Sequence, residues 1–338
     1  MIRYPASLFL ALALLLAAPA IPARAGEGLL DTLAIRNQGP LAQLHGLPAV
    51  LDARQPQAGR LQTRLLVDVA SNYADHATDG EELLFDGETD RVALVLNLGL
   101  PRDWSVGLEV PWVSHRGGFL DSFIENWHDI FSLPQGGRDL VSNNRLTYRY
   151  RKDGITLLDL QTKESGLGDV ALNCAWQPIR EDGPNGRALA LGARLELPTG
   201  DADRLLGSGG TDLALWLAGS ARTPFEGGTL AAHMAIGMLA MSRGDVLADQ
   251  QRPLAAFGRF GFAWGPTDWI AFKVQLDGHS PLYEDSAMDE LDAPAALLTL
   301  GGTLGLPADL DLDLGVTEDV AVNTAPDVTF HVALNRSF

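Results

Sequence analysis

The chain has little cysteine and little positive charge. Its 338 residues include one cysteine, Cys174, so no intramolecular disulfide can form, and we interpret that side chain as a small apolar one. Lys and Arg together number 25 against 43 Asp and Glu, which gives a net charge of -18 at pH 7. Nucleic-acid binding needs basic patches that neutralise phosphates. The charge therefore argues against a nucleic-acid partner.

Long apolar runs are also missing, except near the N-terminus. There, Arg3 precedes an uncharged run over residues 8–18, and Ala23-Arg24-Ala25 places small residues at the positions that signal peptidase reads. We interpret residues 1–25 as a cleavable signal peptide, so that the mature chain starts at Gly26. A membrane-spanning helix needs about 20 apolar residues, and no later segment meets that length. The sequence therefore argues against a helical membrane protein.

Known catalytic motifs are absent too. The sequence contains no G-x-S-x-G nucleophile elbow, no G-x-G-x-x-G, no P-loop and no H-E-x-x-H. We predict no enzyme activity, no cofactor and no metal site. A packed Trp127-His128 pair explains His128 and its acidic neighbours better than a metal or acid-base cluster. The alternative is a surface enzyme that acts on lipid. It needs a nucleophile near His115 or His128, and no spacing indicates one.

The chain is rich in segments whose apolar residues alternate with polar or small ones. Successive side chains of a strand point to opposite faces, and one face of the segment 104–112 carries Trp104, Val106, Leu108, Val110 and Trp112. Aromatic residues at both ends of an apolar row are typical of the girdles of membrane barrels. We count about 12 such segments, each near the 9 to 11 residues that a tilted strand needs to cross a bilayer.

The connections between these segments alternate in length. Short turns with Pro, Gly or Asp occur at 100–103, 265–268 and 306–309, whereas longer acidic segments cover 72–83, 198–211 and 279–294. Short periplasmic turns and long external loops are typical of bacterial outer-membrane barrels, whose strand number is even. We therefore predict an all-β fold, a transmembrane antiparallel up-and-down β-barrel of about 12 strands over residues 61–338. A soluble periplasmic sandwich also has alternating strands, but it does not explain this asymmetry.

The C-terminal strand ends on a bare phenylalanine. Its alternating residues resemble the C-terminal signature by which such barrels are recognised for membrane insertion, and the expected insertion signal comprises Phe330, Val332, Leu334 and Phe338. Arg336 falls on the same row, where an apolar residue is usual, and a long basic side chain near the interface can reach water. The resemblance implies the barrel-insertion machinery as a partner.

The inward row carries charges. Alternation predicts that nine titratable residues point into the lumen and away from lipid: Glu109, Arg194, Glu196, Asp212, His233, Arg259, Lys273, Asp277 and Asp311. If a passage exists, these side chains set its selectivity. Pairs such as Arg194 with Glu196 and Arg259 with Asp277 are equally compatible with a lumen that the charges hold shut. The sequence leaves both alternatives open.

Two pieces of the chain lack strand alternation. Residues 26–60 contain Pro40, Gly46 and Pro48 and form either a plug in the lumen, an arm docked below it or a plain periplasmic tail. In the longest external loop, 115–145, a helical spacing of apolar residues predicts an amphipathic helix. It serves either as a lid over the mouth, which we favour, or as an element resting on the outer leaflet. The expected lid residues are Phe123, Ile124, Trp127, His128 and Phe131.

Beyond this loop, Asp153-Gly154 predicts the turn of a hairpin above the membrane. The acidic external loops have two interpretations. One is a solvated surface, which we prefer, and the other is binding to lipopolysaccharide through divalent cations.

Several of these segments resemble one known family. The motifs N-Q-x-P-L, G-L-P and F-D-G-E, followed by G-G-F-L-D-x-F-I-E-x-W-H-x-x-F-x-L-P-x-G-G-R, are similar to the bacterial envelope family catalogued as domain of unknown function 3187. The match covers most of the mature chain. It implies an outer-membrane β-barrel without an assigned activity. The short segments 166–169 and 197–200 also resemble outer-membrane transporters for small aromatic compounds, although a turn requirement alone accounts for them.

Together these patterns predict a protein of the bacterial outer membrane. The predicted function is a channel or binding protein for small solutes, including hydrophobic or aromatic ones. The alternative is a structural barrel with a filled lumen that maintains envelope integrity and transports nothing. The expected partners are outer-membrane lipids, lipopolysaccharide and a small-molecule solute.

Overall fold

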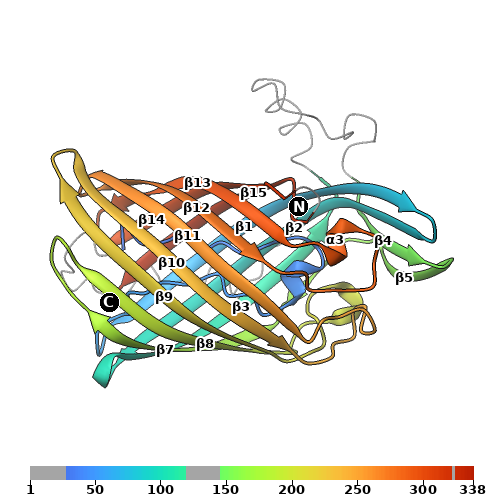
Figure 1. Cartoon of the computed structure of the whole chain (residues 1–338), viewed down its shortest axis with the longest axis horizontal. Helices are drawn as coiled ribbons and strands as arrows, with labels where there is room; N and C mark the ends of the chain where they lie inside the picture. The colour runs from blue at the N-terminus through green and yellow to red at the C-terminus, as the bar shows by residue number, and fades with distance from the viewer. Residues whose placement is uncertain (1–27, 119–144, 322–323) are drawn as a thin grey trace.

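A closed antiparallel barrel of 12 strands forms most of the molecule (Figure 1). The computed structural model describes residues 28–118, 145–321 and 324–338. The barrel strands are β1 (Leu61–Thr78), β2 (Glu81–Leu100), β3 (Trp104–Arg116), β7 (Val170–Arg180), β8 (Arg187–Leu197), β9 (Asp212–Phe225), β10 (Gly228–Met241), β11 (Leu254–Thr267), β12 (Ile270–His279), β13 (Ala295–Leu306), β14 (Leu310–Asp319) and β15 (Val328–Ser337). The predicted fold class is confirmed.

The first and last strands close the barrel. Residues 62–71 of β1 pair with residues 328–337 of β15 in antiparallel register. At the chain end, the amide of Phe338 donates to the carbonyl of Leu61 at 2.8 Å. Closure lets the wall amides and carbonyls pair within the sheet, apart from irregularities at residues 176–179 and 264–267, and the hydrocarbon of a bilayer requires such pairing.

The outer surface of the wall carries the predicted apolar rows. Met234 and Ile236 of β10 are 61% and 63% exposed, and many other large apolar side chains of the wall strands are exposed with them. Soluble monomers rarely expose so large an apolar surface. Aromatic rings gather at the end with the short turns. There Trp104 stacks on Trp176 with ring centroids 6.3 Å apart, and Trp264 lies 5.7 Å from Phe272. This band has the position of an interfacial girdle. Among the described residues, no helix has the length and apolar character needed to cross a membrane.

The two ends of the barrel differ as expected. Short connections at 101–103, 181–186, 226–227, 268–269 and 307–309 lie at the end where β1 starts and β15 stops. At the other end lie the long loops 198–211, 242–253 and 280–294, which include the short helices η4 (Ala202–Arg204) and α3 (Asp289–Asp292). We call these the periplasmic and external ends, following the layout of outer-membrane barrels.

The prediction of an external loop at residues 72–83 is wrong. The segment 72–83 is not a loop, because β1 and β2 continue as strands and are joined by the two-residue turn Asp79-Gly80, in which Gly80 has a φ of 97°. The physical reason lies in additional pairing: β4 (Thr147–Lys152) hydrogen bonds to the outer part of β2, residues 81–86. Because these residues are mostly polar, the sequence pattern did not indicate that β1 and β2 continue as strands beyond the membrane.

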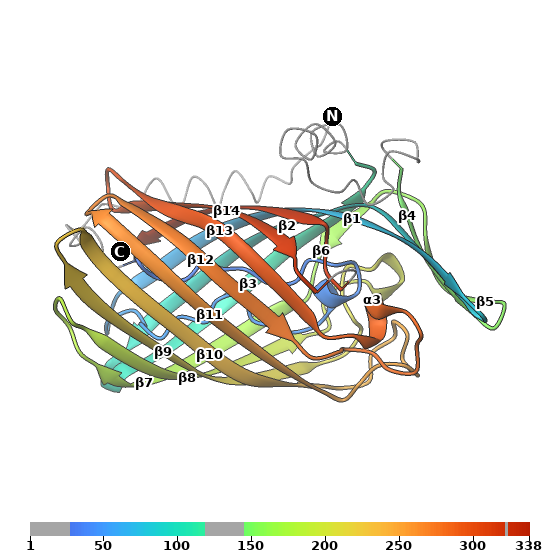
Figure 2. The same cartoon turned by 45° about the horizontal axis from the view of Figure 1, so that its top comes forward.

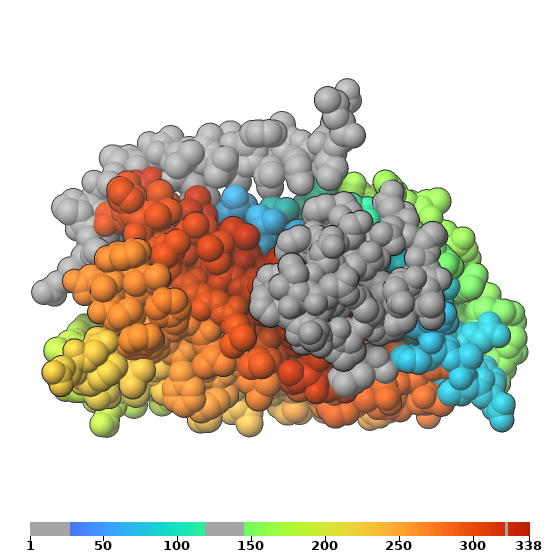
Figure 3. Space-filling model, turned by 90° about the horizontal axis from the view of Figure 1, so that it is seen from above, coloured from blue at the N-terminus to red at the C-terminus, as the bar shows by residue number. Residues whose placement is uncertain are grey.

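The predicted hairpin at 145–163 is present next to this extension. β4 pairs with β5 (Ile155–Leu160) across Asp153-Gly154, whose φ values of 51° and 77° are those of a type I′ turn. β6 (Glu164–Leu167) pairs with the external part of β3. Figures 2 and 3 show the β1–β2 tip and the β4–β5 hairpin side by side at the external end. The predicted helix of the 115–145 loop lies outside the described residues.

Candidate functional site

The lumen of the barrel contains the segment 28–60, which we call the plug. It enters at the periplasmic end, where Gly28 lies beside Asp311, and rises along the inner wall through residue 38. It turns back at the external end through residues 39–45, which include the 3-10 helix η1 (Ala42–Leu44), and returns to the start of β1. Residues 32–49 are all buried. Figures 1 and 2 show this blue segment running inside the wall.

The plug forms no strand of the barrel, and its backbone pairs with a wall strand at its end, where Gly59 and Arg60 bond to Gly99 of β2 at 2.9 Å. Pro40 and Pro48 lack an amide donor, and most backbone groups of the wall already pair within the barrel. The plug's own amides and carbonyls therefore need side-chain partners. The wall supplies them: Gln275 accepts from the Leu33 amide at 3.0 Å and donates to the Leu33 carbonyl at 3.2 Å, and His233 donates to the Leu30 carbonyl at 2.6 Å.

Arg259 binds both limbs of the plug at once. Its guanidinium donates to the carbonyl of Ile35 on the rising limb at 2.6 Å and to the carbonyl of Ala49 on the returning limb at 3.0 Å. The remaining donors reach the Thr32 hydroxyl at 3.2 Å and the carboxylate of Asp277 at 2.6 Å. Five donors in a fixed planar arrangement allow one arginine to hold four partners.

A second charge network lies between the plug and strands β3 and β8. Glu109 accepts from Arg194 at 2.6 Å and is also bonded by Arg91, and Arg194 reaches Glu196 at 3.1 Å. These four side chains are almost completely buried. Arg36 of the plug approaches them and donates to the carbonyls of Gln43, at 3.0 Å, and His45. Buried charges of both signs must be paired and hydrogen bonded to remain charged.

Two acidic residues of the plug have shifted pKa values. Burial alone would raise the pKa of Asp52, but the Arg64 guanidinium, 2.5 Å away, and hydrogen bonds from Arg64 and Thr32 lower it below its ordinary value. Burial raises the pKa of Asp31 to about 6, although Arg222 lies 3.0 Å away and acts in the opposite direction. Asp52 is thus the firmly charged anchor of the plug, and Asp31 titrates closer to neutral pH.

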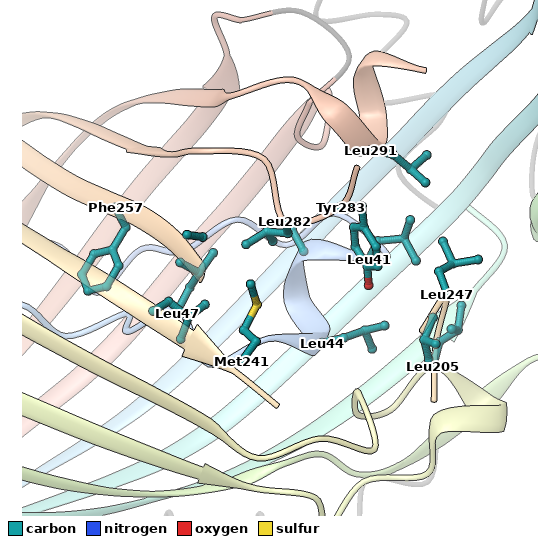
Figure 4. Packing of buried hydrophobic residues seen from close by; sticks show 14 of the residues in the cluster. Leu41, Leu44, Leu47, Leu205, Met241, Leu247, Phe257, Leu282, Tyr283 and Leu291 are labelled. Atoms are coloured by element: carbon teal, nitrogen blue, oxygen red, sulfur yellow. The ribbon is translucent and has the colours of Figure 1, made fainter. Parts of the chain in front are cut away.

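The external mouth is covered by apolar packing. η1 and its neighbours on the plug direct leucine side chains toward residues of the three long external loops (Figure 4). This cluster includes Leu41, Leu44, Leu47, Leu205, Met241, Leu247, Phe257, Leu282, Tyr283 and Leu291. Two hydrogen bonds orient it: Gln43 donates to the Leu205 carbonyl at 2.9 Å, and His45 lies 2.9 Å from the Tyr283 hydroxyl. Burial raises the pKa of Tyr283 well above its ordinary value, so this phenol stays protonated.

The periplasmic end is open by comparison. A cavity of about 780 Å³ lies there between the plug and the wall. Its lining is polar and of mixed charge, and includes Asp31, Gln55, Arg60, Arg64, Asp311 and Asp313. Farther inside, a hollow of about 40 Å³ remains between the returning limb and the wall near Arg194. The described part of the lumen is therefore an aqueous vestibule below a filled section.

The structure brings together most of the residues expected in the lumen. Eight of them are at most 7% exposed on inner rows: Glu109, Arg194, Glu196, Asp212, His233, Arg259, Lys273 and Asp277. Asp311 lines the vestibule. Asp212 accepts from the Gly46 amide of the plug at 2.9 Å, and Lys273 lies 3.6 Å from Asp313. Their role in selectivity stays a prediction, since these charges bind one another or the plug.

The other predicted site residues divide into two groups. The lid residues Phe123, Ile124, Trp127, His128 and Phe131 lie outside the described residues. The C-terminal residues Phe330, Val332 and Leu334 share one row of β15, on which Val332 is 40% exposed. The Arg336 guanidinium lies 4.7 Å from the ring centroid of Phe338, which gives this unexpected arginine a stacked position. Their role as an insertion signal stays a prediction.

The predicted set of lumen residues was incomplete. Arg91, Asp68 and Gln275 lie on inner rows, and alternation alone assigns them to that face. Asp68 accepts from Gln38 of the plug at 3.1 Å and lies 2.6 Å from His331. Among the described residues, no group of three His, Cys, Asp or Glu side chains is arranged to hold a metal ion.

The two motifs at 166–169 and 197–200 contact each other. The Asp169 carboxylate accepts from the amides of Gly200, at 2.7 Å, and Ser208, at 3.0 Å, while the Thr199 hydroxyl donates to the Gly168 carbonyl at 2.8 Å. These bonds tie the start of β7 to the loop after β8. A structural requirement of this turn thus accounts for both motifs.

Comparison with solved structures supports the fold. The chain is similar to the COG4313 outer membrane channel from Pseudomonas putida F1, with a TM-score of 0.54 and 13% identity over 87% of this chain and 98% of that one. The NanC porin aligns with a TM-score of 0.44 and 9% identity over 81% of this chain and 97% of its own. The first likeness shows a shared barrel fold.

Comparison of sequences identifies the family. No curated protein matches this chain. A family model described as a protein of unknown function, DUF3187, matches residues 8–338, which include the segments that resembled this family in the sequence. The chain therefore belongs to the DUF3187 family.

Proposed function

We propose that this protein is a gated outer-membrane channel for small solutes, and that the plug is its gate. The observation that carries the proposal is the filling of a closed, charge-lined lumen by a segment outside the strand ladder. Because only the last plug residues, Gly59 and Arg60, pair with the backbone of a wall strand, the rest of the plug can shift while the barrel stays closed. Each neutral hydrogen bond of the plug contributes only about 0.5–1.5 kcal/mol net, and each one to a charged group about 1.5–3 kcal/mol.

The residues that line the lumen favour one class of solute. Inner rows present arginines, carboxylates and amides at mid-depth, and the vestibule adds charges of both signs. Such a lining compensates the lost hydration of small polar or zwitterionic molecules better than that of aliphatic ones. Hydrophobic or aromatic solutes, which the sequence also suggests, would first meet the apolar packing at the external mouth.

A disulfide lock tests the gate. An ideal Cβ built on Gly46 lies 3.4 Å from the Cβ of Glu196, close to the spacing of about 3.5–4.5 Å found in disulfides. The built Cβ also lies 2.8 Å from the Cβ of Asp212, so Asp212→Gly is included to make room. Gly46→Cys with Glu196→Cys and Asp212→Gly, in a Cys174→Ser background, would bond the plug to the wall. In planar bilayers we expect the oxidised variant to be silent and the reduced variant to conduct.

The reduced variant is the matched control, because it carries the same four substitutions and lacks only the bond. Equal conductance before and after reduction would show that solutes do not need the plug to move. Silence of the wild type and of the reduced variant would reject the channel.

The second candidate is a structural barrel that transports nothing. The buried ion pairs and the apolar packing at the external mouth favour it, because both stabilise a permanently filled lumen. It predicts that gene loss sensitises the envelope without changing the uptake of any solute. The channel would be supported if the deletion strain lost uptake of a solute and the disulfide-lock variant restored that uptake only under reducing conditions.

A further inference from the structure

A single side chain ties the top of the rising limb to the external end of the barrel. Asn37 is 2% exposed, and its amide nitrogen lies 2.9 Å from Nε2 of His279, the last residue of β12. The same nitrogen donates to the Thr324 carbonyl at 3.0 Å, and the side-chain oxygen accepts from the Gly39 amide at 2.8 Å. Asn37 thus links the plug, β12 and the connection between β14 and β15.

The partners determine where each proton lies. The Gly39 amide is a donor, so it must face the side-chain oxygen of Asn37, and the Thr324 carbonyl is an acceptor, so it must face the amide nitrogen. On the ring, Nδ1 of His279 faces the Ser280 carbonyl at 2.9 Å and therefore carries the hydrogen. Nε2 is then the bare nitrogen of a neutral imidazole, and it accepts from Asn37.

Protonation of His279 would reverse this contact. An imidazolium carries hydrogens on both nitrogens, so two donors would face each other across the short gap to Asn37. A flip of the Asn37 amide does not relieve the conflict, because it exchanges the atoms that now pair with Gly39 and Thr324. Resting on the proposed function, we propose that the His279–Asn37 contact is an acid-sensitive latch that holds the plug in its closed position.

The charged groups around the His279 ring also make its protonated form unfavourable, with one exception. Arg36 and His45 of the plug face His279 and would repel its positive charge. On the neighbouring strands, Phe257 and Ala295 pair with it and offer no charge. The carboxylate of Asp319 is occupied by the amides of Thr324, at 2.8 Å, and Ala325, at 3.0 Å.

The exception is His45 itself. Its Nδ1 lies 3.4 Å from the carboxylate of Asp212, which attracts positive charge and holds the returning limb. The latch applies to one limb of the plug.

Other histidines of the wall lack this geometry. His115 donates to the Leu205 carbonyl, and its second nitrogen faces the Thr89 hydroxyl at 3.1 Å, which can rotate from donor to acceptor. His331 faces the carboxylate of Asp68, which accepts from either form of the ring. Of the histidine contacts in the described residues, the one to Asn37 opposes an amide donor whose orientation is fixed.

Protons can reach the latch. His279 is half-buried, and a hollow of about 40 Å³ at the external end is lined by Gly39, Pro40, Asn72 and Thr324. The space is sufficient for water beside Gly39 and Thr324, whose backbone groups are the partners of Asn37. An acid-sensitive contact at this position would respond to the pH of the external medium.

His279→Gln tests the latch in the full-length protein. Glutamine keeps an acceptor oxygen toward Asn37 and does not titrate. For the wild type in planar bilayers, we expect the open probability to rise about tenfold when the external pH falls from 7.5 to 5, the change produced by losing roughly one buried hydrogen bond. We expect His279→Gln to show no such rise. The control is His76→Gln, which replaces a histidine at the external end whose side chain contacts Glu290 of α3 and not Asn37.

Hydrogen exchange provides a second measurement. After correction for intrinsic exchange, amides of residues 35–39 should exchange faster at pH 5 in the wild type and in His76→Gln, and not in His279→Gln. A full acid response in His279→Gln, or none in the wild type, would overturn the latch. Acid-dependent exchange in a protein that never conducts would support the latch and reject the channel, so the two failures are distinguishable.

Discussion

Arg259 shows why a charged side chain lies in the middle of this barrel. An arginine in an open pore would select ions, whereas this one spends its donors on Ile35, Ala49 and Thr32 of the plug and on Asp277 of the wall. Lys273, on the next strand, pairs with Asp313, a wall residue. Arg259 thus holds the plug in the lumen, whereas Lys273 pairs within the wall.

We expect Arg259→Met to loosen the plug. The substitution removes hydrogen bonds to both limbs and leaves Asp277 buried without its ion pair, a change that costs about 3–5 kcal/mol in other proteins. Lys273→Met is the control, since it also removes one buried cation but leaves the plug contacts of Arg259 in place. Hydrogen exchange over residues 32–49 should accelerate in Arg259→Met alone. Equal acceleration in both variants would show that the plug responds to overall stability and not to Arg259.

At the scale of the element, β10 illustrates how one strand serves two environments. Its outward residues are large, such as Met234 and Ile236, and its inward residues include Ala231 and Ala235. Leu29 and Leu30 of the plug pack against Ala231 and against alanines of β11 and β12. Small inward side chains leave room for the plug, because an 8- to 12-stranded barrel with large ones would fill its own lumen.

A matched pair of substitutions on this strand tests the lipid contact. Met234 lies near the middle of β10, whereas Leu230 lies on the same face close to the periplasmic turn. We expect Met234→Arg to lower the free energy of unfolding by about 2–4 kcal/mol and Leu230→Arg by about 0–1 kcal/mol. Urea titration in liposomes measures both. If the two variants were equally stable, this face would not cross hydrocarbon.

For the whole molecule, closure depends on the last residues of the chain. Phe338 completes the β1–β15 seam by exchanging backbone hydrogen bonds with Leu61, and its ring lies under Arg336. The seam itself extends over residues 328–337. The side chain of Phe338 is therefore not needed for pairing, which leaves it available for recognition during assembly.

Phe338→Ala separates recognition from folding. We expect several-fold less folded barrel in the outer membrane of cells, because the insertion machinery would bind the terminal strand more weakly. Refolding of the purified variant into detergent should match the wild type, since the backbone pairing with Leu61 remains. A heat-modifiable band shift on gels measures both. A defect that appears equally in detergent would assign Phe338 a structural role.

The barrel could be predicted because strand alternation is a local property. The rows that include Trp104, Met234 and Val332 face outward as expected, and the short turns alternate with long loops. The inward assignment of Glu109 and Arg194 followed from the same parity. The extension of β1 and β2 beyond Asn72 was missed, because acidic side chains on a strand outside the membrane look like those of a loop.

The sequence by itself determined a barrel wall. Every second side chain of a wall strand must suit hydrocarbon, and this requirement can be recognised from residues that are close together in the chain. Only the tertiary structure decided that the lumen is filled. The path of the plug depends on contacts such as the one between Leu33 and Gln275, which are 242 residues apart. No local pattern encodes such a pairing, because the energy of a charge or amide inside the barrel depends on which distant group the closed wall brings opposite it.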